Sequence, residues 1–246
     1  MWRAFLFSGR FLTRLPLPDP GPADAIVAGR AALFYPLIGL LIGALLWGLA
    51  VVLSDAPASV AGVLILCLWV WLTGALHLDG LSDAADGWVG GLGSRERTLE
   101  IMRDPRSGAM GVVAVALLLL AKSSALTAMV AAGHASTLLW IPALARVQLL
   151  VAMLIVPYAR ATGMASAAVA NLPRRSAWLI VIVSPVVVAA LAGAAGLAVV
   201  IASAGLFAAW RLGLMKRLGG FTGDTAGALV ELSEASALVV VVLLWA

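Results

Sequence analysis

Three aspartates with helical spacing stand out in an otherwise apolar sequence. The segment His77-Leu-Asp-Gly-Leu-Ser-Asp-Ala-Ala-Asp-Gly87 puts Asp79, Asp83 and Asp86 at i, i+4 and i+7, so one face of a helix carries all three carboxylates. Carboxylates gathered in this way repel one another unless a cation lies among them. Magnesium prefers carboxylate oxygens and commonly bridges them to substrate phosphates. The spacing therefore predicts a metal site, with a helix cap followed by exposed acids as the simpler alternative.

A second segment, near the end of the chain, is also acidic and could complete the same site. Gly219-Gly-Phe-Thr-Gly-Asp-Thr-Ala-Gly227 is followed by Glu231 and Glu234 at i, i+3 spacing. Its glycines allow a close approach of backbone to a ligand, and Asp224 is expected at a helix N-terminus. A metal site shared by Asp224, Glu231, Glu234 and the three aspartates is the economical interpretation. The alternative is that these acids only mark the edge of a membrane span.

Cations near these acids suit an anionic substrate. Arg103 and Arg106 flank Asp104 in the segment 101–111, and the planar guanidinium matches phosphate oxygens; setting membrane topology is their alternative role. Lys122 and Arg146 lie in apolar runs, where they either pair with the acids or approach the substrate. Three roles remain possible for His77: a metal ligand, an acid/base group or a residue at the membrane interface. Together these residues predict magnesium-assisted phosphoryl transfer from a pyrophosphate donor.

The composition requires a membrane to hold this site. Of 246 residues, 63% are hydrophobic and only 11% are charged, with mean hydropathy +1.08, whereas a globular domain carries roughly 25% charged residues. One cysteine excludes a disulfide framework and a multi-cysteine metal site. The 16 basic residues are spread over several loops, which favours topology determinants over nucleic-acid binding. We therefore predict one integral membrane domain over residues 1–246.

Runs of about 20 mostly apolar residues can cross a bilayer as helices. The fifth run is too long for one helix, and we expect it to divide at Gly193-Ala-Ala-Gly196. Arginines before the first span and in 77–108 place those segments in the cytoplasm. The sequence thus predicts an all-α bundle of about seven transmembrane helices, with a cytoplasmic N-terminus and cytoplasmic active-site segments at 77–108 and 219–234. The candidate spans are 32–53, 59–76, 109–131, 137–157, 177–210 and 226–246.

Five segments, in order along nearly the whole chain, resemble the cobalamin synthase family (adenosylcobinamide-GDP ribazoletransferase). The acid-rich block Thr73–Gly87 is highly specific, and the others are individually weaker. Pro105 stands where serine is expected, so no hydroxyl role is assigned there. The segments are Phe11-Leu-Thr-Arg-Leu-Pro-Leu-Pro18, Thr73–Gly87, Met102-Arg-Asp-Pro-Arg-Ser-Gly-Ala-Met-Gly111, Pro157-Tyr-Ala-Arg160 and Gly223-Asp-Thr-Ala-Gly-Ala-Leu-Val-Glu231.

The resemblance implies a multi-pass enzyme of the bacterial inner membrane, with its site facing the cytoplasm, in the last stage of vitamin B12 biosynthesis. A ribose hydroxyl of α-ribazole, or of its 5′-phosphate, would attack adenosylcobinamide-GDP, release GMP and form adenosylcobalamin or its 5′-phosphate, with Mg²⁺ required. The general base stays open between His77 and a carboxylate. The implied metal ligands are Asp79, Asp83, Asp86, Asp224, Glu231 and Glu234, and the implied substrate contacts are Arg103, Arg106, Asp104 and Asp224.

Two other classes of membrane protein share some of these features. CDP-alcohol phosphotransferases also use magnesium and aspartate clusters, but in their signature Asp-Gly is followed by Ala-Arg and more widely spaced aspartates; here Asp83 follows Asp79 by four residues. A cation-coupled transporter predicts acids at the membrane midplane, whereas these acids cluster at one face. The expected partners are the substrates and the lipid bilayer, without nucleic acid. Assembly into homo-oligomers or with other corrinoid-assembly enzymes is left open.

Overall fold

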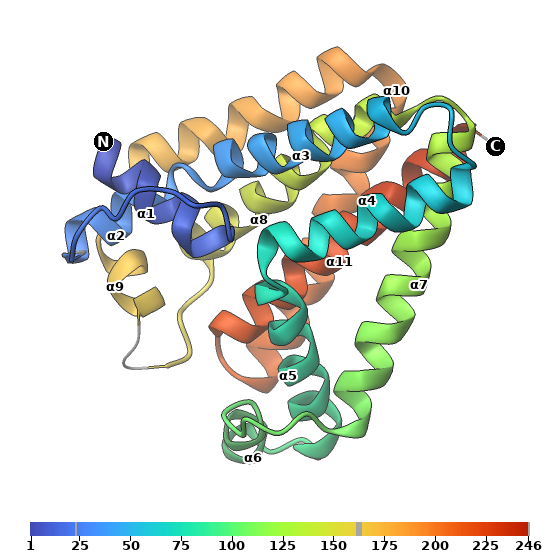
Figure 1. The fold of residues 1–246 in the computed structure, drawn as a ribbon. Coiled ribbons are helices and arrows are strands. Elements are labelled where there is room, and N and C mark those ends of the chain that lie inside the picture. Colours follow the sequence, from blue (N-terminus) through green and yellow to red (C-terminus); the bar gives the residue numbers. More distant parts are fainter. Residues whose placement is uncertain (23, 161–163, 246) are drawn as a thin grey trace.

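The computed structural model describes residues 1–22, 24–160 and 164–245. It is 80% helical and, within those residues, has no strand, which confirms the predicted all-α class (Figure 1). The helices are α1 (Trp2–Leu12), α2 (Ala25–Ala32), α3 (Tyr35–Val52), α4 (Ala58–Thr73), α5 (Leu76–Gly90), α6 (Arg95–Ile101), α7 (Ala109–Ala131), the 3₁₀ helix η1 (Ala135–Leu139), α8 (Ile141–Ile155), α9 (Met164–Ala170), α10 (Arg174–Arg217) and α11 (Gly223–Trp245).

Five helical stretches of the described chain are long and apolar enough to cross a membrane. They are α3, α7, η1 with α8, α10 and α11, and the bent pair α4 and α5 raises the number to six. The predicted number of seven is reached only if the two halves of α10 are counted separately, so it stays a prediction. The cytoplasmic placement of the N-terminus stays a prediction as well.

The expected division of the fifth apolar run is present as a break inside α10. Gly193 has φ 58° and ψ −137°, which is not helical, and glycine reaches this backbone region without the steric cost of a Cβ. The two halves of α10 run in different directions from this point (Figure 1). The glycine-rich motif Gly193-Ala-Ala-Gly196 therefore ends one helical segment and begins another.

A sharp bend separates the apolar helix α4 from the acidic helix α5. The two helices meet at 87°, because Gly74 and Ala75 both adopt left-handed backbone angles, with φ of 59° and 57°. A Cβ at Gly74 would collide with the side chain of Arg14. The backbone N–H of Arg14 donates to the Leu72 carbonyl oxygen at 2.7 Å. The bend directs the polar residues of α5 away from the line of α4.

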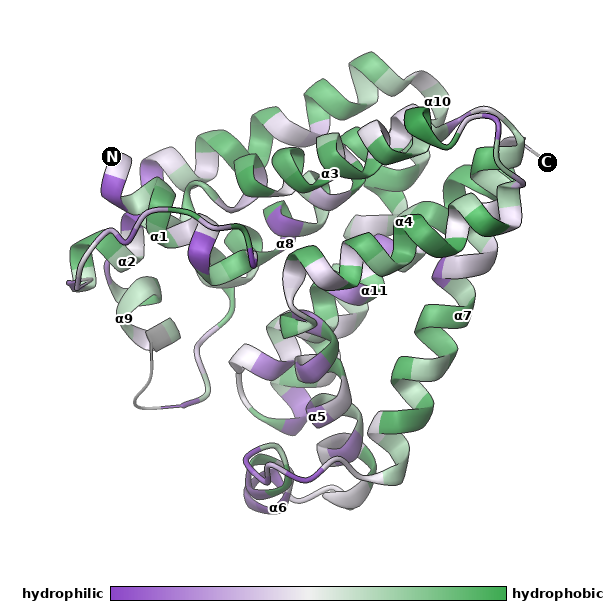
Figure 2. Cartoon of the chain, in the orientation of Figure 1, coloured by the Kyte–Doolittle hydropathy of each residue, from purple (hydrophilic) through white to green (hydrophobic). Residues whose placement is uncertain are grey.

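The helices differ in how much of their surface is buried, which distinguishes the central helices of the bundle from the outer ones. In the η1 and α8 stretch 78% of the apolar window is buried, against 28% in α7 and 22% in α10. The outer helices present large apolar side chains outward, such as Leu120 and Leu191, which are 67% and 83% exposed. Hydrophobic residues cover α3, α7 and α10, while hydrophilic residues gather over α5 and α6 (Figure 2). This distribution fits a bundle with lipid around it and chemistry at one end.

Candidate active site

The three aspartates of α5 share one face, as their spacing predicts, because the segment Leu76–Gly90 is a continuous helix. The Asp79 residue is exposed, whereas Asp83 and Asp86 are half-buried. The side chains of Asp79 and Asp83 form no hydrogen bond or ion pair with any described residue. These two carboxylates are therefore available to a ligand.

The second acidic segment packs directly against the first, so the two predicted active-site segments form one site. Helices α5 and α11 approach closely because small residues line their contact. A Cβ at Gly80 would lie 2.8 Å from the Asp224 carbonyl oxygen, and one at Gly227 would lie 3.2 Å from the Cα of His77. Larger side chains at either glycine would separate the helices. Asp224 is thereby held beside the acidic face of α5.

A short backbone pairing brings Arg160 to this site. The Ala159 N–H donates to the Phe221 carbonyl oxygen at 2.8 Å, and the Phe221 N–H donates to the Pro157 carbonyl oxygen at 2.9 Å. Arg160 then donates from a terminal nitrogen to Asp224 Oδ2 at 2.6 Å. Residues 64 positions apart in the chain thus form an ion pair at the N-terminus of α11.

The resulting site is a group of carboxylates with one guanidinium group beside them. The charges of Asp79, Asp224 and Asp86 all act on Asp83 as repulsive neighbours, and Arg160 acts on it as an attractive one. Repulsion among partly desolvated carboxylates favours binding of a cation. Among the residues that the structure describes, however, no three His, Cys, Asp or Glu side chains are gathered closely enough to hold a metal ion by themselves.

Asp86 forms hydrogen bonds with the backbone that its spacing from Asp79 and Asp83 did not predict. Its two carboxylate oxygens accept the N–H groups of Gly108 and Gly111 at 2.7 and 2.8 Å. These groups belong to the first turn of α7 or its cap, where helix N–H groups lack partners within the helix. Asp86 therefore anchors the start of α7 to α5, and its oxygens are less available to a metal than those of Asp79 and Asp83.

Glu231 and Glu234 lie in a buried cluster of charges. Both accept a hydrogen bond from Lys122 Nζ at 2.6 Å, Glu234 also pairs with Arg146, and Lys122 lies 4.6 Å from the centre of the Trp69 ring. The four ionic side chains are at most 5% exposed. Of the two predicted roles for Lys122 and Arg146, pairing with acids is the one observed. Because cations already occupy both glutamates, we leave them out of the proposed metal site.

The predicted phosphate contacts around Asp104 lie on an exposed turn. Arg103 is exposed, and the Arg106 side chain is 86% exposed while it donates to Asp104 at 2.7 Å. Side-chain and backbone hydrogen bonds from Arg106 lower the pKa of Asp104 to about 2. None of the three residues lines the cavity described below. Their role in substrate binding stays a prediction.

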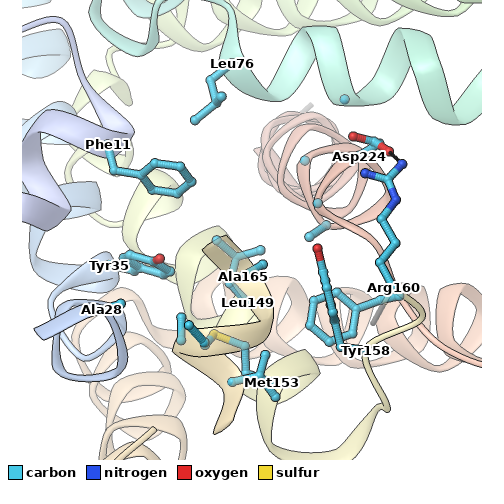
Figure 3. Close-up of a pocket in the computed structure, with 18 of the residues that line it drawn as sticks. Phe11, Ala28, Tyr35, Leu76, Leu149, Met153, Tyr158, Arg160, Ala165 and Asp224 are labelled. Carbon is cyan, nitrogen blue, oxygen red and sulfur yellow. Dashed lines mark hydrogen bonds and ion pairs between the residues drawn. The ribbon is translucent and has the colours of Figure 1, made fainter. Parts of the chain in front are cut away.

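A cavity of about 690 Å³ opens beside the acidic site. His77, Asp79, Asp224 and Arg160 line it together with apolar side chains of α1, α3, α8 and α9. Figure 3 shows Phe11 and Tyr35 on one side of the space and Tyr158, Arg160 and Asp224 on the other. His77 Nδ1 and Arg160 Nε are buried without a hydrogen-bond partner among the described residues.

Sequence reasoning missed the aromatic and cationic wall of this cavity. Burial raises the pKa of the Tyr158 phenol, and its ring packs edge-on against Phe221 with centroids 5.2 Å apart. The segment Pro157–Arg160 carries part of the family resemblance, but no chemistry was assigned to it. Only the pairing of Pro157 and Ala159 with Phe221 reveals that Arg160 faces Asp224.

Comparison with known proteins gives a consistent set of relatives. A family model described as cobalamin-5-phosphate synthase matches residues 4–242. A protein of Pseudomonas entomophila named adenosylcobinamide-GDP ribazoletransferase is 46% identical over 235 residues, 96% of each chain. Proteins of the same name from Pseudomonas paraeruginosa and Pseudomonas fluorescens are 48% and 45% identical, over 98% and 94% of this chain and 98% and 95% of theirs. No solved structure matches the chain.

Proposed function

This chain belongs to the cobalamin-5-phosphate synthase family, and on that premise we propose that it transfers the cobinamide phosphate of adenosylcobinamide-GDP to α-ribazole or its 5′-phosphate. In this reaction a ribose hydroxyl oxygen forms a bond to the phosphorus attached to cobinamide. The bond from that phosphorus to the bridging oxygen breaks, and GMP leaves. The hydroxyl proton passes to a base, and the product is adenosylcobalamin or its 5′-phosphate.

The observation that carries the proposal is the meeting of three groups at one cavity. Asp79, on the acidic helix α5, and the ion pair of Arg160 with Asp224 line the same space. A pyrophosphate donor brings negative charge that needs a cation or hydrogen-bond donors. Arg160 has a buried Nε without a hydrogen-bond partner in residues 1–22, 24–160 and 164–245, which suits a phosphate oxygen. Phosphoryl transfer depends mainly on such positioning and charge stabilisation.

The acidic residues suit a magnesium ion that is shared with the substrate. Magnesium is commonly bound by one or two carboxylates together with substrate phosphates and waters, so a cluster of three protein ligands is not required. We assign Asp79 and Asp83 as its protein ligands, since neither side chain has a hydrogen-bond or ion-pair partner in the described part of the chain. Asp224 is a further candidate, in competition with its bond to Arg160. A bound ion would neutralise the pyrophosphate and favour departure of the nucleotide phosphate.

The base that removes the hydroxyl proton must reach the substrate, so it is expected among the groups that line the cavity. Asp79, Asp224 and His77 line it, whereas Asp83 and Asp86 do not. His77 is buried, and its Nδ1 has no hydrogen-bond partner among the residues that the structure describes, so this nitrogen can accept a proton or a hydrogen bond in the neutral imidazole. With Asp79 assigned to the metal, we propose His77 or Asp224 as the base.

The proposal is tested with purified protein in lipid, adenosylcobinamide-GDP, α-ribazole and magnesium. We expect GMP to be released together with a joined corrinoid product. The 5′-phosphate of α-ribazole is tested in parallel to identify the preferred acceptor. Failure of a folded preparation to release GMP with either acceptor would refute the proposed function.

A further inference from the structure

The cavity beside the acidic site has two chemically different ends. Asp79, Asp224 and Arg160 lie at one end, and the rings of Phe11 and Tyr35 line the other. In Figure 3 the rings of Phe11 and Tyr35 face the space from the side opposite Arg160 and Asp224. The two rings are stacked on each other with centroids 6.2 Å apart. A ligand that fills this cavity therefore needs a flat apolar part and a polar part.

We propose that the apolar end binds the aromatic base of the ribazole acceptor, an inference that rests on the proposed function. The base is a dimethylbenzimidazole, which is flat and mostly apolar. Its ribose then extends toward Asp79 and Asp224, where the transferred phosphate is expected. The volume of about 690 Å³ lies within the range of roughly 300–1,000 Å³ that is usual for small-ligand sites.

The donor fits the apolar end less well than the acceptor. A guanine base presents an amide edge with several donors and acceptors, and a corrin ring carries amide side chains around its rim. Buried polar groups of this kind cost free energy unless they find hydrogen-bond partners. At this end Asp24 already accepts the Val27 N–H at 2.7 Å as the cap of α2. This wall offers the Tyr35 hydroxyl and the Asp24 carboxylate as polar groups, too few partners for the many polar groups of the donor, and it therefore suits the acceptor base better.

The acceptor and donor Michaelis constants of two variants test the assignment. Phe11→Ala removes a ring from the apolar end, and Met153→Trp fills the space. We expect Phe11→Ala to raise the acceptor KM about three- to tenfold, which is the value of one aromatic contact, and Met153→Trp to raise it further. The donor KM stays unchanged in Phe11→Ala, because the donor occupies the charged end.

Matched substitutions on the same helices serve as controls. Phe5→Ala removes a ring of α1 that packs on Phe34 instead, and Ile155→Trp enlarges a side chain of α8 that is 42% exposed. Both controls should keep the two KM values of the unmodified protein. A rise in the donor KM with Phe11→Ala would assign the apolar end to the donor. Unchanged KM values for both substrates would remove this cavity from the substrate site.

A labelling experiment decides the assignment without turnover. Phe11 is 41% exposed, so Phe11→Cys combined with Cys67→Ser offers one accessible thiol at the apolar end. We expect α-ribazole to slow alkylation of this thiol and guanosine diphosphate to leave its rate unchanged. Protection by guanosine diphosphate, or no protection by α-ribazole, would overturn the inference. Protection by α-ribazole without any GMP release in the turnover assay would mean that the binding site is correct and the proposed function is wrong.

Discussion

Replacing Lys122 with methionine tests the buried cluster of charges that ties α7, α8 and α11 together. Lys122 holds both Glu231 and Glu234 through hydrogen bonds of 2.6 Å. Methionine keeps an unbranched apolar chain but removes the ammonium group. Glu234 would still pair with Arg146, whereas Glu231, which is 4% exposed, would lose the cation that it contacts.

The size of the effect follows from the cost of neutralising Glu231. Protonating a glutamate with an ordinary pKa of about 4.3 costs about 3.7 kcal/mol at pH 7, at about 1.4 kcal/mol per unit. The loss of the contact between Lys122 and Trp69 adds about 0.5 kcal/mol or more. A total near 4 kcal/mol agrees with the roughly 3–5 kcal/mol measured when one partner of a buried pair is removed.

Thermal unfolding in detergent measures this cost. For a chain of this size about 4 kcal/mol corresponds to a fall in Tm of about 8–16 °C. The double variant with Lys122→Met and Glu231→Gln should recover at least about 2 kcal/mol, because no unpaired charge remains. Lys216→Met, at an exposed position of α10, is the control and should change stability by less than about 0.5 kcal/mol. An unchanged Tm for Lys122→Met, or no recovery in the double variant, would show that Lys122 does not stabilise the fold by neutralising Glu231.

Three further predictions concern the site and its placement. Asp83→Asn should lower GMP release about 100-fold or more without lowering Tm, and EDTA should abolish release in the unmodified protein until magnesium is restored; activity that survives both treatments would contradict the metal assignment. Asp86→Ala should destabilise the protein by about 1–2 kcal/mol in thermal unfolding because α7 loses its cap, and an unchanged Tm would argue against that role. With Cys67 replaced, a thiol at Ser94 should react with a membrane-impermeant reagent only from the cytoplasmic side and one at Ala135 only from outside, and the reverse pattern would invert the topology.

Local periodicity predicted the acidic helix well. The i, i+4, i+7 spacing of Asp79, Asp83 and Asp86 depends only on neighbouring residues, and the helix over Leu76–Gly90 realises it. The break in α10 was predictable for the same reason, since Gly193 ends a helix through its own backbone preference. The close packing of the two acidic segments was expected from their shared chemistry, and Gly80 and Gly227 explain how it occurs.

The partners of individual charges could not be predicted from local pattern. Glu231 and Glu234 were grouped with the metal ligands because they lie near Asp224 in the sequence. Their cation Lys122 lies 109 and 112 residues away from them, and only the packing of α7 against α11 brings it close. Glu231 is also eight residues beyond Gly223, so it lies about 12 Å further along the helix. The contact between Arg160 and Asp224 depends in the same way on the pairing of distant loops.

The proposed transfer of cobinamide phosphate to ribazole fixes the stoichiometry of the reaction in the presence of magnesium. Purified protein is incubated with adenosylcobinamide-GDP and a limiting amount of α-ribazole, and GMP and corrinoid product are both quantified. We expect one GMP and one joined product for each ribazole consumed, and neither product with Asp79→Asn. GMP release without ribazole consumption, or equal turnover by Asp79→Asn, would show that this chain does not couple the two substrates as proposed.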